Sequence, residues 1–339
     1  MSANLTQPVK VFLARMGDAP PSEPFRQAGP GFVFVSCIED ADFVLVPYGT
    51  RRLTPRFVEH VQRTVCEAKK YGVEVVVIVS GDLGHRIHLE NVLVFKVSAY
   101  RHSKRQNEIV SVSRTEDFWK NTTYVPRGKS PRPSVSFCGY AGFPSIVTRI
   151  KYLIRNAACD VAAVCSREPH WRAHKRGIYF RRKAIGLLKN DSRLEPRFII
   201  RDAFFLDALR EGSDRARARQ EFIDNMRNAD FVLAPKGDGN YSIRFFEALS
   251  MGRIPILIDT DMVLPLEKMI DYSKFILRVP HTEIHTLPDR IVDLYNSLSD
   301  EEFQNMQRAA RGAYVKYLNQ GAFYNAAFPL LKERGSEAL

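Results

Sequence analysis

The chain has 339 residues, 45% of them hydrophobic and 26% charged, a balance typical of an ordinary globular protein with substantial cores. Fifty basic residues against 38 acidic ones give a net charge of +12, which favours phosphates, acidic glycans, nucleic acid or an anionic membrane as partners. The sequence has no apolar run long enough for a transmembrane helix and no signal-peptide pattern at its start. We therefore expect a cytoplasmic protein, which leaves open peripheral contact with the inner face of a membrane.

Short apolar runs alternate with helical patterns along the first half. The predicted strands cover residues 9–14, 32–35, 43–46, 73–79 and 92–97. Between the third and fourth of them, residues 55–71 have a helical pattern. Thr54 can cap this helix, Pro55 suits its first turn and Gly72 follows its end.

The second half repeats this rhythm. Its predicted strands are 135–138, 161–164, 198–200, 231–234 and 254–258, and its predicted helices are 145–156, 215–227, 243–251, 290–298 and 301–317. The strands are apolar enough to be covered on both faces. Alternating strands and helices predict an α/β fold with parallel sheets.

The segment 126–133, Pro-Arg-Gly-Lys-Ser-Pro-Arg-Pro, has the composition of a linker. Its prolines and basic residues cannot form a core element. It predicts an N-terminal domain over residues 1–130 and a C-terminal domain with terminal helices over residues 131–339. The five cysteines are scattered and favour neither a disulfide framework nor a zinc site.

An internal echo links the two predicted domains. Residues 41–59 align without a gap on residues 229–247, with 10 identities in 19 positions. Arg56 and Glu59 fall opposite Arg244 and Glu247 in this alignment. Two copies of one strand-loop-helix unit explain the match better than a chance likeness between two apolar strands.

The second copy has the features of an anion site. A predicted strand ends near Pro235, and a turn containing Lys236, Gly237 and Gly239 leads to Ser242, which can cap the next helix. Glycines let main-chain amides approach a ligand closely. Free amides at a helix start, at the carboxyl end of a strand, favour a bound phosphate.

Arg244 and Glu247 lie three residues apart in the first turns of that predicted helix and share one face. A guanidinium matches the geometry of phosphate oxygens, and a carboxylate can accept hydrogen bonds from ribose hydroxyls. The alternative is an ion pair within the helix that has no ligand. The residues alone leave both interpretations open.

Residues 222–259 resemble the signature of exostosin-type glycosyltransferases, a GT47-like family. The family pattern reads Pro-x-Gly, then Ser-x-Arg-Phe-x-Glu-Ala, then Gly-x-Ile-Pro, and the matching residues here are Pro235, Gly237, Ser242, Arg244, Phe245, Glu247, Ala248, Gly252, Ile254 and Pro255. Residues 41–47 and 136–139 match the family more weakly.

The resemblance implies a GT-B fold, in which two Rossmann-like domains with parallel sheets face a central cleft. It also implies inverting transfer of a sugar from a nucleotide diphosphate, UDP by our expectation, to a glycan or lipid-linked acceptor in polysaccharide biosynthesis. Arg244 would then meet the diphosphate and Glu247 the ribose, with no metal or other cofactor required. The alternative is a non-catalytic polyanion-binding protein that keeps the fold.

An inverting reaction needs a general base, which we expect from the N-terminal domain. Asp82 and His85 follow the predicted strand 73–79, and Asp18 follows the first strand. The alternative is that Asp82 caps a turn and His85 is solvated. We call the turn with Lys236, Gly237 and Gly239 the donor turn. The residues at the corresponding place in the N-terminal domain include three basic side chains, which we expect to contact the acceptor or the diphosphate: Arg51, Arg52 and Arg56.

Three other patterns in the sequence suggest binding or metal chemistry. Asp259 and Asp261 resemble a metal-binding pair, but a turn is the favoured interpretation. His170 and His174 have helical metal-ligand spacing, yet no acidic or cysteine partner lies near them in the sequence. The basic segment 167–183 could bind an acidic glycan, anionic lipid or nucleic acid, of which nucleic acid is the least favoured, or could be a plain solvated surface.

Overall fold

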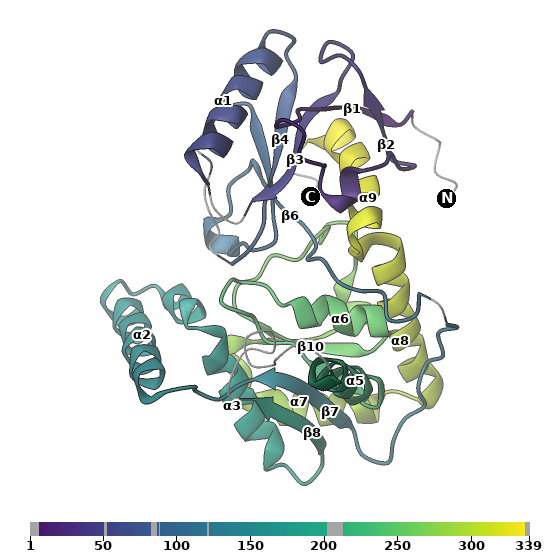
Figure 1. Ribbon diagram of the computed structural model, residues 1–339. Coiled ribbons are helices and arrows are strands. Elements are labelled where there is room, and N and C mark those ends of the chain that lie inside the picture. Colours follow the sequence, from purple (N-terminus) through teal and green to yellow (C-terminus); the bar gives the residue numbers. More distant parts are fainter. Residues whose placement is uncertain are drawn as a thin grey trace. The chain divides into compact units, whose positions relative to one another are not determined.

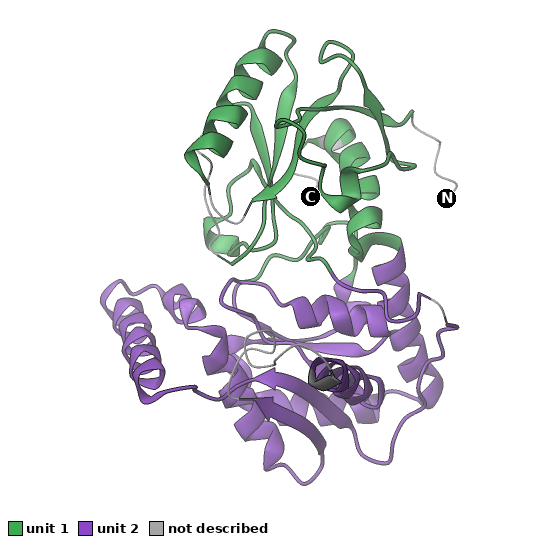
Figure 2. Ribbon diagram, viewed as in Figure 1, with its two compact units in different colours: residues 1–114, 262–271, 316–339 green, residues 115–261, 272–315 purple. Residues whose placement is uncertain are grey.

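The computed structural model describes residues 7–50, 53–82, 87, 89–120, 122–201 and 213–335. The chain forms two compact units (Figures 1 and 2). Unit 1 comprises Met1–Arg114, Met262–Asp271 and Lys316–Leu339, and unit 2 comprises Thr115–Asp261 and Tyr272–Val315. Each unit is built on one parallel sheet, which confirms the predicted α/β class with two Rossmann-like domains. The predicted cleft stays a prediction.

The sheet of unit 1 has the strand order β2-β1-β3-β4-β5-β6, and its neighbouring strands pair in parallel. The strands are β1 (Val9–Leu13), β2 (Phe32–Val35), β3 (Phe43–Thr50), β4 (Glu74–Val79), β5 (Val92–Lys96) and β6 (Glu108–Val110). Helix α1 (Pro55–Lys69) begins as predicted, because the Thr54 hydroxyl accepts a hydrogen bond from the Phe57 amide at 3.3 Å.

Successive side chains of a strand point to opposite faces of its sheet, and the two faces of the unit 1 sheet pack against different helices. Val94 of β5 belongs to a buried cluster with Phe57 and Val61 of α1. Its neighbour Phe95 meets the aromatic rings of Phe323, Tyr324 and Phe328 from α9 (Gln320–Arg334), with centroids 5.4–6.1 Å apart. The C-terminal helix therefore completes the core of the N-terminal unit.

The sheet of unit 2 has the order β8-β7-β9-β10-β11, again with parallel pairing. Its strands are β7 (Ser134–Tyr140), β8 (Glu195–Arg201), β9 (Phe231–Leu233), β10 (Ile254–Asp259) and β11 (Leu277–Pro280). Written in chain order, this connectivity repeats that of β2-β1-β3-β4-β5. The echoing segments belong to β3 and β9, which hold the same place in their sheets, so the topology supports two copies of one unit.

The helices of unit 2 surround this sheet, except where α2 extends from it (Figure 1). They are α2 (Ile146–Cys165), α3 (Gly177–Lys189), α5 (Ser213–Arg227), α6 (Ile243–Met251), α7 (Leu287–Ser297) and α8 (Asp300–Ala313), with short turns of 3-10 helix at η3 (Pro169–His174), η4 (Tyr272–Lys274) and η5 (His281–Thr286). Within the described part of the chain, no helix combines the length and apolarity needed to cross a bilayer.

The predicted strand at residues 161–164 is wrong. These residues continue helix α2, which runs on past the predicted helix end at residue 156 to Cys165. The apolarity of the run Val161-Ala-Ala-Val164 predicts a buried strand, yet Val161 and Val164 are exposed on the helix. An apolar run of this length does not by itself distinguish a strand from part of a helix.

The observed division of the chain differs from the predicted boundary at residue 130. The basic side chains of the predicted linker bind unit 2: Arg127 Nε donates to Asp230 Oδ1 at 3.1 Å, and Lys129 Nζ donates to the carbonyls of Tyr295 and Leu298, both at 2.6 Å. Unit 2 therefore begins at Thr115, and the chain returns to unit 1 at Lys316. Composition identified an irregular segment there but not the surface that binds it.

Candidate functional site

The predicted donor segment lies where the strand order of unit 2 reverses. From β7 the chain goes first to β8 on one side and then to β9 on the other side. In open α/β sheets, ligands bind outside the carboxyl ends of the two strands at such a point. The segment from Ala234 to Ser242 follows β9 directly and leads into α6. The topology therefore places the turn that the sequence singled out at the expected ligand position.

Arg244 reaches from the first turn of α6 to the carboxyl end of β7. Its Nη2 donates to the Cys138 carbonyl at 2.6 Å, and its guanidinium carbon lies 4.4 Å from the centre of the Phe137 ring. Gly139 makes room for it, since a β-carbon there would lie 2.6 Å from Nη2. The Nε atom is buried and has no acceptor among the described residues. The guanidinium thus links α6 to β7 and keeps one donor unused.

Glu247 lies one helical turn after Arg244, and the two form no ion pair within the described structure. Burial raises the pKa of the Glu247 carboxyl, while the charges of Arg244 and Arg219 oppose that rise. No hydrogen bond to its side chain occurs among the described residues. A half-buried carboxylate without a donor is well suited to accept hydroxyl groups of a ligand. The alternative of an intrahelical ion pair is therefore not what the structure contains.

The turn before α6 is closed by a hydrogen bond from the Gly237 amide to the Tyr241 carbonyl at 2.8 Å. Ser242 occupies the N-cap position as predicted, but its hydroxyl does not accept an amide of the helix. Gly237 and Gly239 are not among the described glycines with positive φ. Gly252, which ends α6, has a left-handed backbone with a φ of 65°.

Lys236 is buried, with 1% of its surface exposed. Its Nζ donates to the Ala173 carbonyl at 2.6 Å and lies 5.6 Å from the centre of the Phe180 ring. Burial lowers its pKa to about 7. Gly177 makes this packing feasible, because a β-carbon there would overlap the carbonyls of Lys236 and Gly237. The lysine therefore ties the donor turn to η3 and α3 and can change its charge near neutral pH.

The UDP binding that the sequence predicts at this turn should take up a proton through Lys236 at pH 8. The ammonium form is a minority above its pKa, and a nearby diphosphate favours it. Calorimetry in two buffers with different ionisation enthalpies measures this uptake. The variant Lys236→Met should lose it and the exposed-lysine control Lys189→Met should keep it. Equal uptake in Lys236→Met would contradict the assignment.

The lowered pKa of Lys236 also determines how the stability of the protein changes with pH. Between about pH 7 and 10.5 the unfolded chain holds a proton on Lys236 that the native chain has released, so this residue makes stability rise with pH across that window. Below pH 7 both states hold the proton, so the difference in stability between the wild type and Lys236→Met should no longer change with pH.

Further arginines point their side chains at the end of β7, and the sequence did not identify them as part of the site. Arg181 of α3 donates to the carbonyls of Tyr140 and Lys236 at 3.1 and 3.3 Å, and Arg182 donates to the Ala141 carbonyl at 3.0 Å. Both lie in the basic segment 167–183, which was treated as surface. The helical pattern of α3 could have indicated a buried face, but not that this face meets β7.

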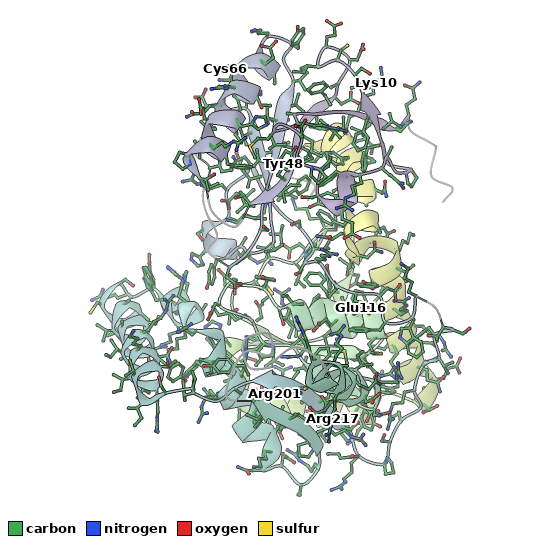
Figure 3. The ribbon with its side chains drawn as sticks, in the orientation of Figure 1. Lys10, Tyr48, Cys66, Glu116, Arg201 and Arg217 are labelled. Carbon is green, nitrogen blue, oxygen red and sulfur yellow. The ribbon has the colours of Figure 1, made fainter. Side chains whose placement is uncertain are left out.

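Two more groups complete the surroundings of the strand ends. Arg201, labelled in Figure 3, ends β8 and contacts Glu221 at 2.5 Å. His281 follows β11: its Nδ1 lies 3.0 Å from the Asp259 carbonyl, and its buried Nε2 has no partner among the described residues. Burial lowers the pKa of His281 and favours the neutral ring. No sequence motif had drawn attention to either residue.

The structure describes only some of the candidate residues of unit 1. Asp18 is exposed after β1, and Asp82 is exposed after β4 beside Gly81, whose φ is 92°. Arg56 is exposed in the first turn of α1, the position that corresponds to Arg244. His85, Arg51 and Arg52 lie outside the described residues. Asp18 and Asp82 therefore follow strands as the sequence predicts, and their chemical roles stay predictions.

The metal-like patterns have structural roles. Asp259 accepts a hydrogen bond from Arg278 Nε at 2.8 Å, and His170 Nε2 lies 3.5 Å from Glu168. Among the described residues, no group of three or more histidine, cysteine, aspartate or glutamate side chains could hold a metal ion. All five cysteines are free.

Residues 187–294 match the family model described as the exostosin GT47 domain, a span that includes the donor turn, Arg244 and Glu247. Over 100 residues the chain is 28% identical to the Exostosin-1 homolog of Caenorhabditis elegans, covering 30% of this chain and 25% of that protein. It is 33% identical over 122 residues to Exostosin-1 of Drosophila melanogaster, covering 36% and 16%. It is 24% identical over 113 residues to the probable arabinosyltransferase ARAD1 of Arabidopsis thaliana, covering 33% and 25%.

The chain thus spans a quarter or less of the length of these relatives. Among solved structures, a glycosyltransferase from Rickettsia africae ESF-5 aligns with a TM-score of 0.38 at 11% identity, covering 97% of this chain and 100% of that one. TarM aligns with a TM-score of 0.36 at 12% identity, covering 79% and 56%. Through residues 187–294, which hold the turn before α6 and the Arg244–Glu247 face, the chain is similar to the exostosin GT47 domain.

Proposed function

We propose that the protein is an inverting glycosyltransferase that uses a UDP-sugar and a glycan or lipid-linked acceptor. The observation that carries the proposal is the face of α6 at the strand reversal, where Arg244 has an unused buried donor and Glu247 an unpaired carboxylate. A guanidinium suits a diphosphate, and a carboxylate suits the two hydroxyls of a ribose. Both groups lie within the segment that matches the family model.

The proposed reaction is a single displacement. The acceptor hydroxyl attacks the anomeric carbon from the face opposite the diphosphate, the bond between that carbon and the phosphate oxygen breaks, and the hydroxyl proton passes to a base. Charge develops on the leaving diphosphate, where a fixed guanidinium stabilises it more in the transition state than in the ground state. Because Arg244 meets this charge, the proposal assigns no metal, and a chelator should leave turnover unchanged.

A panel of nucleotide sugars tests the activity. Released nucleotide is measured for UDP-, GDP- and dTDP-sugars, with and without glycan acceptors. The proposal expects release from a UDP-sugar. A protein that releases no nucleotide from any donor, and binds heparin in a salt-sensitive manner unaffected by Arg244→Ala, would instead be the polyanion-binding alternative.

Asp82→Asn should reduce turnover by about tenfold or more while UDP still binds, because the amide cannot accept the acceptor's proton. Asp18→Asn is the matched control, since it removes another exposed carboxylate that follows a strand of unit 1. Turnover and binding are measured separately, by nucleotide release and by calorimetry. Normal turnover in Asp82→Asn would exclude Asp82 as the base, and a loss confined to Asp18→Asn would assign that role to Asp18.

A further inference from the structure

Helix α2 extends from unit 2, and the neighbouring element that packs along it is η3 (Figure 1). Only Tyr152, Asn156 and Ala163 are buried among its 20 residues. Ser145 caps its start, with the hydroxyl accepting from the Thr148 amide at 3.2 Å. The helix is therefore regular and defined at its N-terminus, although most of its surface is uncovered.

The uncovered surface of α2 is strongly apolar. Seven large side chains are between 50% and 77% exposed: Ile146, Val147, Ile150, Leu153, Ile154, Val161 and Val164. On a wheel of about 100° per residue, they and the small residues between them form an arc about 140° wide. The three buried residues lie on the opposite side of the wheel. Contiguous exposed apolar surface of this kind marks a binding surface in a folded protein.

Basic side chains border this apolar face on both sides. On the wheel, Arg149 lies at one edge, beside Asp160, which pairs with Lys175 at 2.7 Å, and Lys151, followed by Arg155, lies at the other. All three basic side chains of these edges are exposed, and no carboxylate among the described residues pairs with them. An apolar face between two basic edges matches the boundary between acyl chains and anionic headgroups of a bilayer.

We propose that the apolar face of α2 lies in the surface of an anionic membrane. A helix of 20 residues is about 30 Å long, so it would lie flat, with its apolar side chains among the acyl chains and its basic edges at the phosphates. A second copy of the chain is a poorer occupant, because two such faces would bring their basic edges together. The inference does not depend on the proposed activity.

Flotation of the full-length protein with vesicles tests this inference. The protein should float with vesicles of phosphatidylcholine and phosphatidylglycerol at low salt, and binding should weaken with phosphatidylcholine alone. The triple variant Ile150→Ser, Ile154→Ser and Val161→Ser should lose at least about tenfold in membrane affinity. The matched control removes three exposed apolar side chains outside α2, as Val125→Ser, Met269→Ser and Val315→Ser, and should bind like the wild type.

Two further measurements separate the outcomes. The melting temperature and circular dichroism spectrum of the triple variant without ligand should match those of the wild type, which shows that the variant is folded. Arg149→Gln with Lys151→Gln should reduce the preference for phosphatidylglycerol. Failure of the wild type to float, unchanged binding of the triple variant, or a dimer that the triple variant dissociates would overturn the inference.

Discussion

Arg244→Ala should abolish the thermal stabilisation of the protein by UDP and reduce turnover about 1000-fold. Arg244 holds its guanidinium against the Phe137 ring and the Cys138 carbonyl, so the cation is fixed before any ligand arrives. Loss of one partner from a buried charge-assisted contact costs about 2–5 kcal/mol. The measurement is the difference in melting temperature with and without UDP, which separates ligand binding from any change in the stability of the free protein.

Two variants sharpen the Arg244 experiment. Arg244→Lys keeps the charge but loses the planar fork, and should retain only a small part of the stabilisation. Arg290→Ala removes an exposed arginine that pairs with Glu283, and should behave as the wild type because exposed ion pairs contribute little. Full stabilisation of Arg244→Ala by UDP would show that the diphosphate binds elsewhere.

Glu247→Gln should weaken UDP binding about 100-fold without destabilising the free protein. Burial raises the pKa of this carboxyl, which means that the ionised form is disfavoured in the native state. Replacing it with a neutral amide of the same shape removes that cost. The amide keeps one acceptor oxygen but cannot serve two ribose hydroxyls as a carboxylate does.

The ligand series for Glu247 is chosen to locate its contact. UDP and its 2′-deoxyribose analogue are compared by calorimetry on the wild type and on Glu247→Gln. The wild type should prefer UDP, and the variant should bind the two ligands almost equally. A variant that keeps the full preference for UDP, or that unfolds more readily than the wild type below pH 7, would contradict the assigned role.

The sequence allowed the architecture and most of its elements to be predicted. Apolar runs such as 43–46 and 254–258 are buried strands, and Thr54 caps α1 by the predicted hydrogen bond. The echo between residues 41–59 and 229–247 has a topological counterpart, because β3 and β9 hold the same place in their sheets. These features depend on patterns within short segments, which can be recognised in a single sequence.

The errors have non-local causes. The prediction of a strand at Val161 and Val164 assumed that apolar residues are buried, but both side chains are exposed on α2. The sequence did not predict helix α9, because Pro329 interrupts its helical pattern. Its position is fixed by aromatic packing against β5. Sequence alone cannot show which surface a segment will meet.

The candidate site was partly predictable for the same reason. Arg244 and Glu247 were identified from spacing and resemblance, both of which are properties of a short segment. Arg181 and Arg182 join the site only because α3 packs at the end of β7, and this contact links residues about 40 positions apart. The sequence showed that the segment is basic, but not that these two side chains face the end of β7.

A crystal structure of the protein with UDP tests the central claim most directly. The account predicts diphosphate oxygens about 2.7–2.9 Å from the guanidinium of Arg244, at the carboxyl ends of β7 and β9, and ribose hydroxyls at hydrogen-bond distance from the Glu247 carboxylate. A diphosphate bound away from the α6 N-terminus, with Arg244 still committed only to the Cys138 carbonyl, would contradict it.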